Sequence, residues 1–105
     1  MSKHILVLTT ISDEEKGKEI ASELVRERLA ACVTLTAKCF SFYWWEGKIT
    51  QEEEYILFIK TKKEMYKRLE EKLRQIHPYQ VPEIIAFPII KGFTEYLAWI
   101  ERETF

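Results

Sequence analysis

The segment CVTLTAKCFSFYWWEGKITQEEEYILFIKT, residues 32–61, decides the fold. Residues 32–45 are β-branched and then aromatic, with no glycine or proline among them, and residues 49–61 are again rich in strand-forming side chains. Between them lies EGK (46–48), which is typical of a tight turn. The segment therefore predicts two long antiparallel strands joined as a hairpin.

On the N-terminal side of this hairpin, the sequence predicts one strand and one helix. HILVLTTI (4–11) is a short apolar run typical of a buried strand. The SDEE motif that follows resembles a capping box, in which Ser12 caps the helix and Glu15 reaches back to it. Apolar residues then recur at helical spacing, which predicts an amphipathic helix over residues 13–30.

On the C-terminal side, the sequence predicts a helix, a strand and a short final helix. Thr61 and Glu64 form a second capping-box pattern before a helix that ends at His77, because Pro78 disfavours helical backbone in the residue before it. EIIAFPII (83–90) predicts a fourth strand, and a short helix follows Gly92. The residues of this last helix segment expected to face inward are Phe93, Tyr96, Leu97 and Ile100.

Together these elements predict an α+β fold of the ferredoxin-like kind, β-α-β-β-α-β plus a C-terminal helix, with an antiparallel sheet. The sheet order of that arrangement is 4-1-3-2, which places the second and fourth strands at the edges. Pro88 agrees with an edge position, because proline has no N–H to donate to a neighbouring strand. A long exposed edge strand promotes aggregation, so we expect the second strand to pair with another subunit.

Composition limits the range of functions. At 105 residues the chain is predicted to form a single domain over residues 1–105, and sixteen basic against seventeen acidic residues show no bias toward nucleic acid or anionic membranes. No apolar run is long enough to cross a bilayer, and MSKHILVLTT lacks the pattern of a signal peptide. We therefore expect a cytoplasmic protein with no nucleic-acid or membrane partner. Sixteen glutamates, abundant lysine and no asparagine further indicate a thermostable protein.

Four segments, in this order along the chain, resemble the CutA family of divalent-cation tolerance proteins. They are LAACV (29–33), SFYWWEGKI (41–49) followed by Glu54 and IKT (59–61), HPYQVPEI (77–84) and YLAWI (96–100). The resemblance covers nearly the whole chain. It implies a ferredoxin-like homotrimer, related in architecture to the PII signalling proteins, with a link to copper and other divalent cations.

The candidate metal ligands are His77, Glu83 and Cys39. The predicted fold places Thr9, Thr10, His77 and Glu83 at one end of the sheet, with Cys39 near them. Some CutA sequences carry a cysteine at the end of the first strand and a histidine pair before the proline, where this chain has Thr9 and Ile76-His77. A hydroxyl is a poor copper ligand, so we expect no tightly bound cofactor and only weak binding of Cu²⁺ or another divalent cation.

Each of these candidates also has a structural interpretation. His77 lies where a histidine can satisfy the free carbonyl groups at a helix end, and Glu83 is explained equally well as a solvated side chain. Cys32 and Cys39 are seven residues apart on one predicted strand, so we expect them on opposite faces and too far apart for a disulfide. Cys32 is expected to be a small core residue, at the other end of the sheet from His77.

The aromatic residues suggest either a cleft for a planar ligand or an interface between subunits, because aromatic side chains are enriched at interfaces. Glu54 and Lys60 are possible polar anchors beside them. The cleft or interface candidates are Tyr43, Trp45, Glu54, Lys60, Tyr79 and Trp99.

Two functions remain after the alternatives are weighed. An RNA-binding domain of this fold needs a basic third strand, whereas this one reads EEEYILFIKT, and an acylphosphatase needs an asparagine that the chain lacks. No Ser/His/Asp set is present, so we do not expect an enzyme. The sequence predicts a divalent-cation-binding homotrimer. The alternative is a PII-like trimer that senses a small ligand or a partner protein at clefts between subunits.

Overall fold

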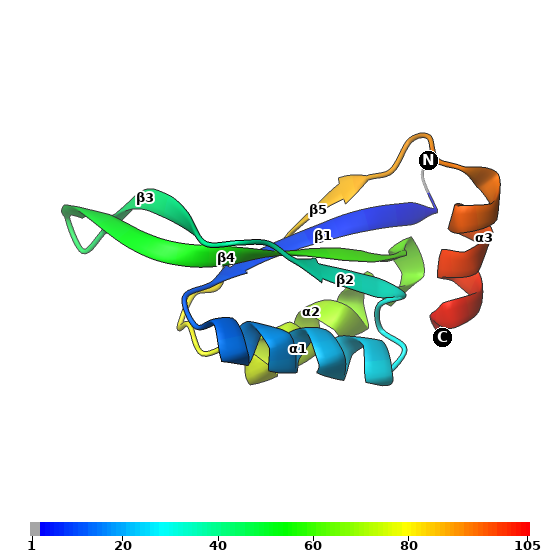
Figure 1. The fold of residues 1–105 in the computed structure, drawn as a ribbon, viewed down its shortest axis with the longest axis horizontal. Coiled ribbons are helices and arrows are strands. Elements are labelled where there is room, and N and C mark those ends of the chain that lie inside the picture. Colours follow the sequence, from blue (N-terminus) through cyan, green and yellow to red (C-terminus); the bar gives the residue numbers. More distant parts are fainter. Residues whose placement is uncertain (1–2) are drawn as a thin grey trace.

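The computed structural model describes residues 3–105, and Figure 1 shows its architecture. Five strands pair antiparallel in the order β2-β4-β1-β5, with β3 paired to the far part of β4. This confirms the predicted α+β, ferredoxin-like arrangement and its sheet order. The elements are β1 (His4–Ile11), α1 (Glu14–Arg26), β2 (Cys32–Leu35), β3 (Cys39–Trp45), β4 (Lys48–Lys62), η1 (Lys63–Met65), α2 (Tyr66–Ile76), β5 (Ile85–Pro88) and α3 (Thr94–Glu103).

The core lies between one face of the sheet and the helices α1 and α2, which run side by side beneath it (Figure 1). Alternate residues of a strand point to the same face, so Ile5, Val7 and Ile11 of β1 join Leu57 and Ile59 of β4 in this core. The residues of α1 and α2 buried against them are Gly17, Ile20, Leu24, Leu69 and Leu73. Among residues 3–105 we find no helix with the length and apolar character of a membrane span.

The structure corrects both predicted helix caps. Asp13, not Ser12, caps α1, and its side chain accepts a hydrogen bond from the Lys16 N–H at 3.2 Å. Neither η1 nor α2 has a side-chain cap, because the Thr61 hydroxyl instead donates to the carbonyl of Leu29 at 2.7 Å. This bond ties β4 to the loop after α1.

Several element ends also differ from the prediction. Helix α1 ends at Arg26 rather than at residue 30, because Arg28 adopts a left-handed backbone with φ of 63° and turns the chain toward β2. Strand β5 is limited to residues 85–88. In the last helix segment Ile100 is fully buried, but Phe93 and Tyr96 are 70% and 40% exposed, so the expectation that both face inward is wrong.

The predicted long strand over residues 32–45 is broken by a β-bulge. Leu35 lies opposite Leu57 and Cys39 lies opposite Glu54, so residues 36–38 face only residues 55–56. Thr36 occupies the bulge, and its hydroxyl accepts a hydrogen bond from the N–H of Ile56 at 2.9 Å. The extra residue shifts the alternation by one. As a result both cysteines face the same side of the sheet, which corrects the expectation of opposite faces, and both are free thiols.

Beyond the bulge, β3 and the start of β4 project from the sheet as a hairpin (Figure 1). Its two-residue turn, Glu46–Gly47, has positive φ values of 49° and 79°. These values are typical of a type I′ turn, whose twist matches that of the strands, and the glycine adopts this backbone without a steric penalty. The hairpin is therefore well defined although no helix covers it in Figure 1.

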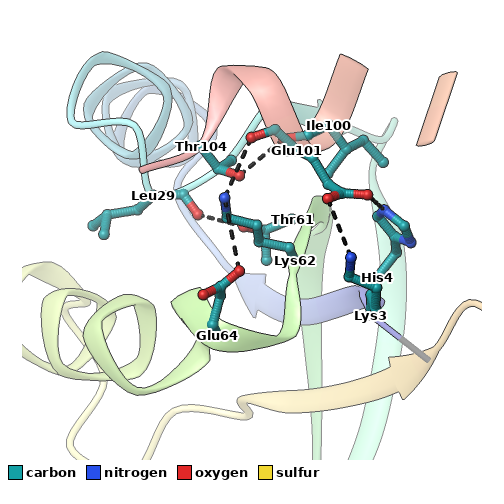
Figure 2. A network of polar contacts seen from close by, with 9 residues as sticks. All are labelled: Lys3, His4, Leu29, Thr61, Lys62, Glu64, Ile100, Glu101 and Thr104. Atoms are coloured by element: carbon teal, nitrogen blue, oxygen red, sulfur yellow. Dashed lines mark hydrogen bonds and ion pairs between the residues drawn. The ribbon is translucent and has the colours of Figure 1, made fainter. Parts of the chain in front are cut away.

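Helix α3 packs against the end of the sheet away from the hairpin (Figure 1). Figure 2 shows the polar contacts that hold it there. The carboxylate of Glu101 lies 3.0 Å from His4 Nε2 and 3.6 Å from Lys3 Nζ, and its carbonyl accepts from Lys62 Nζ at 3.3 Å. The hydrogen bond with His4 is the main reason that the pKa of Glu101 lies below its usual value. This network joins α3 to β1 and β4.

Candidate functional site

A cleft of about 450 Å³ lies between the hairpin and the loop that follows α2. The bulge at residues 36–38 sets its chemistry, because it places Ser41 and Tyr43 on the same face as Glu52 and Thr50. The loop over residues 77–84 supplies the other wall. The lining residues are Thr10, Ser41, Phe42, Tyr43, Trp45, Glu52, Glu54, Tyr79, Gln80, Val81 and Glu83.

Two tyrosine–glutamate pairs organise the cleft. The Tyr79 hydroxyl donates to Glu54 Oε2 at 2.5 Å, and the Tyr43 hydroxyl donates to Glu52 Oε1 at 2.6 Å. Burial, followed by the bond to Glu54, raises the pKa of Tyr79, and the bond to Glu52 raises the pKa of Tyr43 to about 12. Both phenols are therefore protonated at neutral pH and remain donors to the carboxylates.

His77 lies behind the cleft with both ring nitrogens engaged. Nε2 donates to the carbonyl of Thr10 at 2.8 Å, and Nδ1 accepts from the Tyr79 N–H at 3.1 Å. These two bonds fix the neutral tautomer with the proton on Nε2. Burial lowers the pKa of His77, against opposing effects of the Thr10 carbonyl and Glu54. The imidazole therefore ties α2 to β1 in its uncharged form.

The predicted metal candidates meet only in part. Cys39 Sγ donates to the carbonyl of Glu54 at 3.2 Å. The carboxylate of Glu54 accepts from the Tyr79 hydroxyl, and the Tyr79 N–H donates to His77 Nδ1, so thiol and imidazole belong to one network. Glu83 is exposed and makes no hydrogen bond or ion pair with another described residue, although it lines the cleft. No three His, Cys, Asp or Glu residues within 3–105 lie close enough to hold a metal ion. The metal site stays a prediction.

Thr9 and Thr10 point to opposite faces of the sheet, as neighbouring residues on a strand do. Thr10 lines the cleft, whereas Thr9 is fully buried on the helix side of the sheet, and its hydroxyl has no hydrogen-bond partner among the described residues. Of the residues expected together at this end, Thr10 and His77 lie at the cleft or directly behind it, whereas the side chain of Thr9 does not.

Only some of the residues predicted for a cleft or an interface line the cleft. Tyr43, Trp45, Glu54 and Tyr79 line the cleft. Lys60 lies outside it, where its ammonium donates to Thr34 Oγ1 at 2.5 Å and lies 3.7 Å from Cys32 Sγ. Trp99 stands on α3 with its ring 5.5 Å from that of Tyr96. An interface role for these residues stays a prediction.

Glu52 is one of the cleft residues that the sequence interpretation missed. It belongs to the QEEE run (51–54), of which only Glu54 was predicted to be a cleft residue. The available signal was its spacing of two from Glu54, because residues two apart on a strand share a face. Glu53, between them, points to the other face and pairs with Lys38 at 3.4 Å.

Comparison with known proteins identifies the family. Residues 5–103 match the family of the CutA1 divalent ion tolerance protein. The chain belongs to this family. The "Divalent-cation tolerance protein CutA" of Thermus thermophilus is 42% identical over 99 residues, which cover 94% of this chain and 96% of that protein. The resemblance inferred from four sequence segments is thus confirmed.

Two further members extend the comparison. "Protein CutA 1, chloroplastic" of Oryza sativa is 41% identical over 95% of this chain and 56% of its own length. The solved structure of the "Periplasmic divalent cation tolerance protein CutA" from Archaeoglobus fulgidus is 35% identical, with a TM-score of 0.92 over 95% of this chain and 97% of that one. These names place relatives in different compartments, so a cytoplasmic location for this chain stays a prediction.

Proposed function

We propose that this chain acts in divalent-cation tolerance as a homotrimer that binds Cu²⁺ or another divalent ion weakly at the His77 end, without catalysis. The family supports the link to divalent ions. The observation that carries the finer proposal is the network that joins Cys39, Glu54, Tyr79 and His77 at that end. It gathers a thiol, a carboxylate and an imidazole from β3, β4 and the loop after α2.

The same network explains why binding is weak. Copper prefers imidazole and thiolate ligands, but the free electron pair of His77 Nδ1 already accepts the Tyr79 N–H. A bound ion has to displace that hydrogen bond and draw Cys39 Sγ away from the Glu54 carbonyl. We therefore expect micromolar affinity or weaker. Binding should persist below about pH 6.5, the usual pKa of histidine, because burial lowers the pKa of His77 and delays competition by protons.

Calorimetric titration with Cu²⁺ at pH 7.5 and at pH 5.5 tests the metal site. His77→Ala and Cys39→Ser should each weaken binding, with the larger loss for His77→Ala. His4→Ala is the matched control, because His4 contacts Glu101 at the opposite end of the sheet and should leave copper affinity unchanged. Wild-type affinity in His77→Ala would place the metal site elsewhere or remove it.

Assembly is supported by the face of the sheet opposite α1 and α2. Leu6 and Leu8 of β1 share this face with Ile85 and Phe87 of β5, which are 43% and 47% exposed. On the other face of the hairpin, Phe40 and Trp44 are 57% and 71% exposed. Apolar surface of this extent marks an interface in a soluble protein. Together with the β2 edge, it supports burial between three copies.

Light scattering tests the assembly. We expect a mass about three times the 12.6 kDa of the chain. Phe87→Asp should reduce the mass, because it puts a charge on the proposed interface. Val25→Asp is the control, since Val25 is similarly exposed, at 40%, but lies on α1. A monomeric wild type, or equal loss in both variants, would refute the proposed interface.

A second function, a PII-like trimer that responds to a small ligand, is favoured by the cleft beside Tyr79. Its volume of about 450 Å³ is within the range typical of small-molecule sites. The cleft and the proposed copper site use neighbouring groups, but titration with a small ligand and titration with Cu²⁺ measure the two kinds of binding separately.

A further inference from the structure

The cleft carries negative charge that no described residue balances. Glu52, Glu54 and Glu83 line it, yet no lysine, arginine or histidine within residues 3–105 forms an ion pair with any of them. Glu54 is only 4% exposed, and its one side-chain partner is the neutral phenol of Tyr79. A buried carboxylate is costly without a cation. The arrangement therefore favours a cation that comes from solution.

The walls of the cleft favour a cation with an organic body. Phe42, Tyr43, Trp45 and Tyr79 line it, and the faces of such rings attract ammonium groups and pack against methylene groups. The two tyrosine hydroxyls already donate to Glu52 and Glu54, so each directs an acceptor oxygen, not a donor, toward a further ligand. Among the described residues, no lysine or arginine lines the cleft to receive an anion.

We propose that this cleft binds a small aliphatic polyamine. Its carboxylates lie on two elements, β4 and the loop over residues 77–84, with aromatic rings among them. A chain of ammonium groups separated by methylenes matches this alternation of charge and apolar surface. A bare metal ion does not, because no three ligating side chains in the described chain converge. The inference rests on the second proposed function, ligand binding in the cleft, and needs no copper.

The cleft opens on the face of the sheet that also carries Leu6, Leu8, Ile85 and Phe87, because Thr10, Glu52 and Glu54 follow the same strand alternation. Phe40 and Trp44, proposed above for the interface, are paired with Glu53 and Ile49. Tyr43 belongs to the alternate set of side chains and faces the cleft. The assembled protein, not an isolated fragment, is therefore the right material for the test.

Calorimetric titration with spermidine tests the site. We expect binding of the wild type, with affinity about tenfold or more lower in Glu52→Gln and in Glu83→Gln, since each removes one charge-assisted contact. Glu83→Gln also guards against misfolding, because Glu83 is exposed and makes no hydrogen bond or ion pair with another described residue. Glu53→Gln is the matched control: it removes the same charge from the same strand but on the face of Lys38, and it should change affinity less than about twofold.

Two competitors separate the parts of the proposal. Hexane-1,6-diol offers methylenes without charge, and Mg²⁺ offers charge without methylenes; neither should displace spermidine at matched concentration. Equal loss of affinity in Glu52→Gln and Glu53→Gln, or displacement by Mg²⁺, would reduce the effect to bulk electrostatics and overturn the proposal. Absence of spermidine binding would also overturn it. The copper titration of His77→Ala and the mass measurement are separate readouts, so their results stand whichever way the spermidine titration falls.

Discussion

Two buried threonines on neighbouring strands allow a direct test of the energetics of this core. Thr9 on β1 and Thr61 on β4 are both fully buried on the helix side of the sheet. The Thr61 hydroxyl donates to the Leu29 carbonyl at 2.7 Å, whereas the Thr9 hydroxyl has no partner among the described residues. Valine has nearly the shape of threonine. The same substitution should therefore have opposite effects at the two positions.

The magnitudes follow from the two environments. A buried hydroxyl without a hydrogen bond costs roughly 1–3 kcal/mol, and an added buried methyl group contributes about 0.8 kcal/mol. Thr9→Val should therefore raise the free energy of unfolding by about 2–4 kcal/mol. Thr61→Val loses a hydrogen bond worth about 1 kcal/mol and leaves the Leu29 carbonyl without this donor, at a further cost of roughly 1–3 kcal/mol. After the methyl gain, it should be destabilised by about 1–3 kcal/mol.

Equilibrium unfolding in guanidinium chloride measures both changes, at one protein concentration because assembly contributes to stability. The denaturant dependence should stay the same in both variants, so that the shift in midpoint reports stability alone. If Thr9→Val is destabilised as much as Thr61→Val, then the Thr9 hydroxyl has a partner in solution and the reasoning fails.

Three further outcomes are expected. The pKa of His77 is lowered in the folded chain, so as pH falls below about 6.5 the unfolded chain binds the proton first. The free energy of unfolding should therefore decrease toward pH 5 in the wild type, and it should decrease less in His77→Gln, which retains His4. A steeper decrease in the variant would count against this prediction. Thr36→Val removes the acceptor for the Ile56 N–H and the donor to the Ala37 carbonyl, both at 2.9 Å. It should lower the free energy of unfolding, measured with denaturant, by about 1 kcal/mol or more. An unchanged free energy of unfolding would mean that the bulge does not need this hydroxyl. From the glutamate and lysine content we expect a thermal midpoint above ~90 °C by calorimetry, and a value of roughly 45–65 °C would contradict it.

The fold was predictable where periodicity is strong. Residues 4–11 form β1 as expected, because a short β-branched run between turn signals suits a strand buried on one face and partly covered on the other. The end of α1 was not predictable in the same way. The helical pattern continues past Arg26, but the N–H of Ala31 has to reach the Lys60 carbonyl, at 2.9 Å, for β2 to join the sheet. Tertiary pairing therefore overrides local helix propensity at this point.

The candidate site was predictable by residue type but not by bonding. The loop HPYQVPE (77–83) and the aromatic hairpin do meet, and the residues Tyr43, Glu54 and Tyr79 line one cleft. Sequence cannot show that both nitrogens of His77 are already hydrogen-bonded, because one partner, Thr10, lies sixty-seven residues away. For the same reason the exposed Glu83 and the buried Glu54 look alike in sequence, although only Glu54 carries a buried, unbalanced charge.

The bulge at residues 36–38 decides which chemistry the hairpin presents to the cleft. Strict alternation from Cys32 would put Phe40, Phe42 and Trp44 on the face of Glu52 and Glu54, so that β3 would present only apolar side chains beside these carboxylates. The extra residue instead brings Cys39, Ser41 and Tyr43 to that face. TLTAK (34–38) contains no glycine or proline to mark the irregularity, so it is stabilised by a side chain: the Thr36 hydroxyl bonds the Ile56 N–H that the interrupted ladder leaves without a strand partner. One threonine thus helps to set both the polar lining of the cleft and the apolar stripe on its other side.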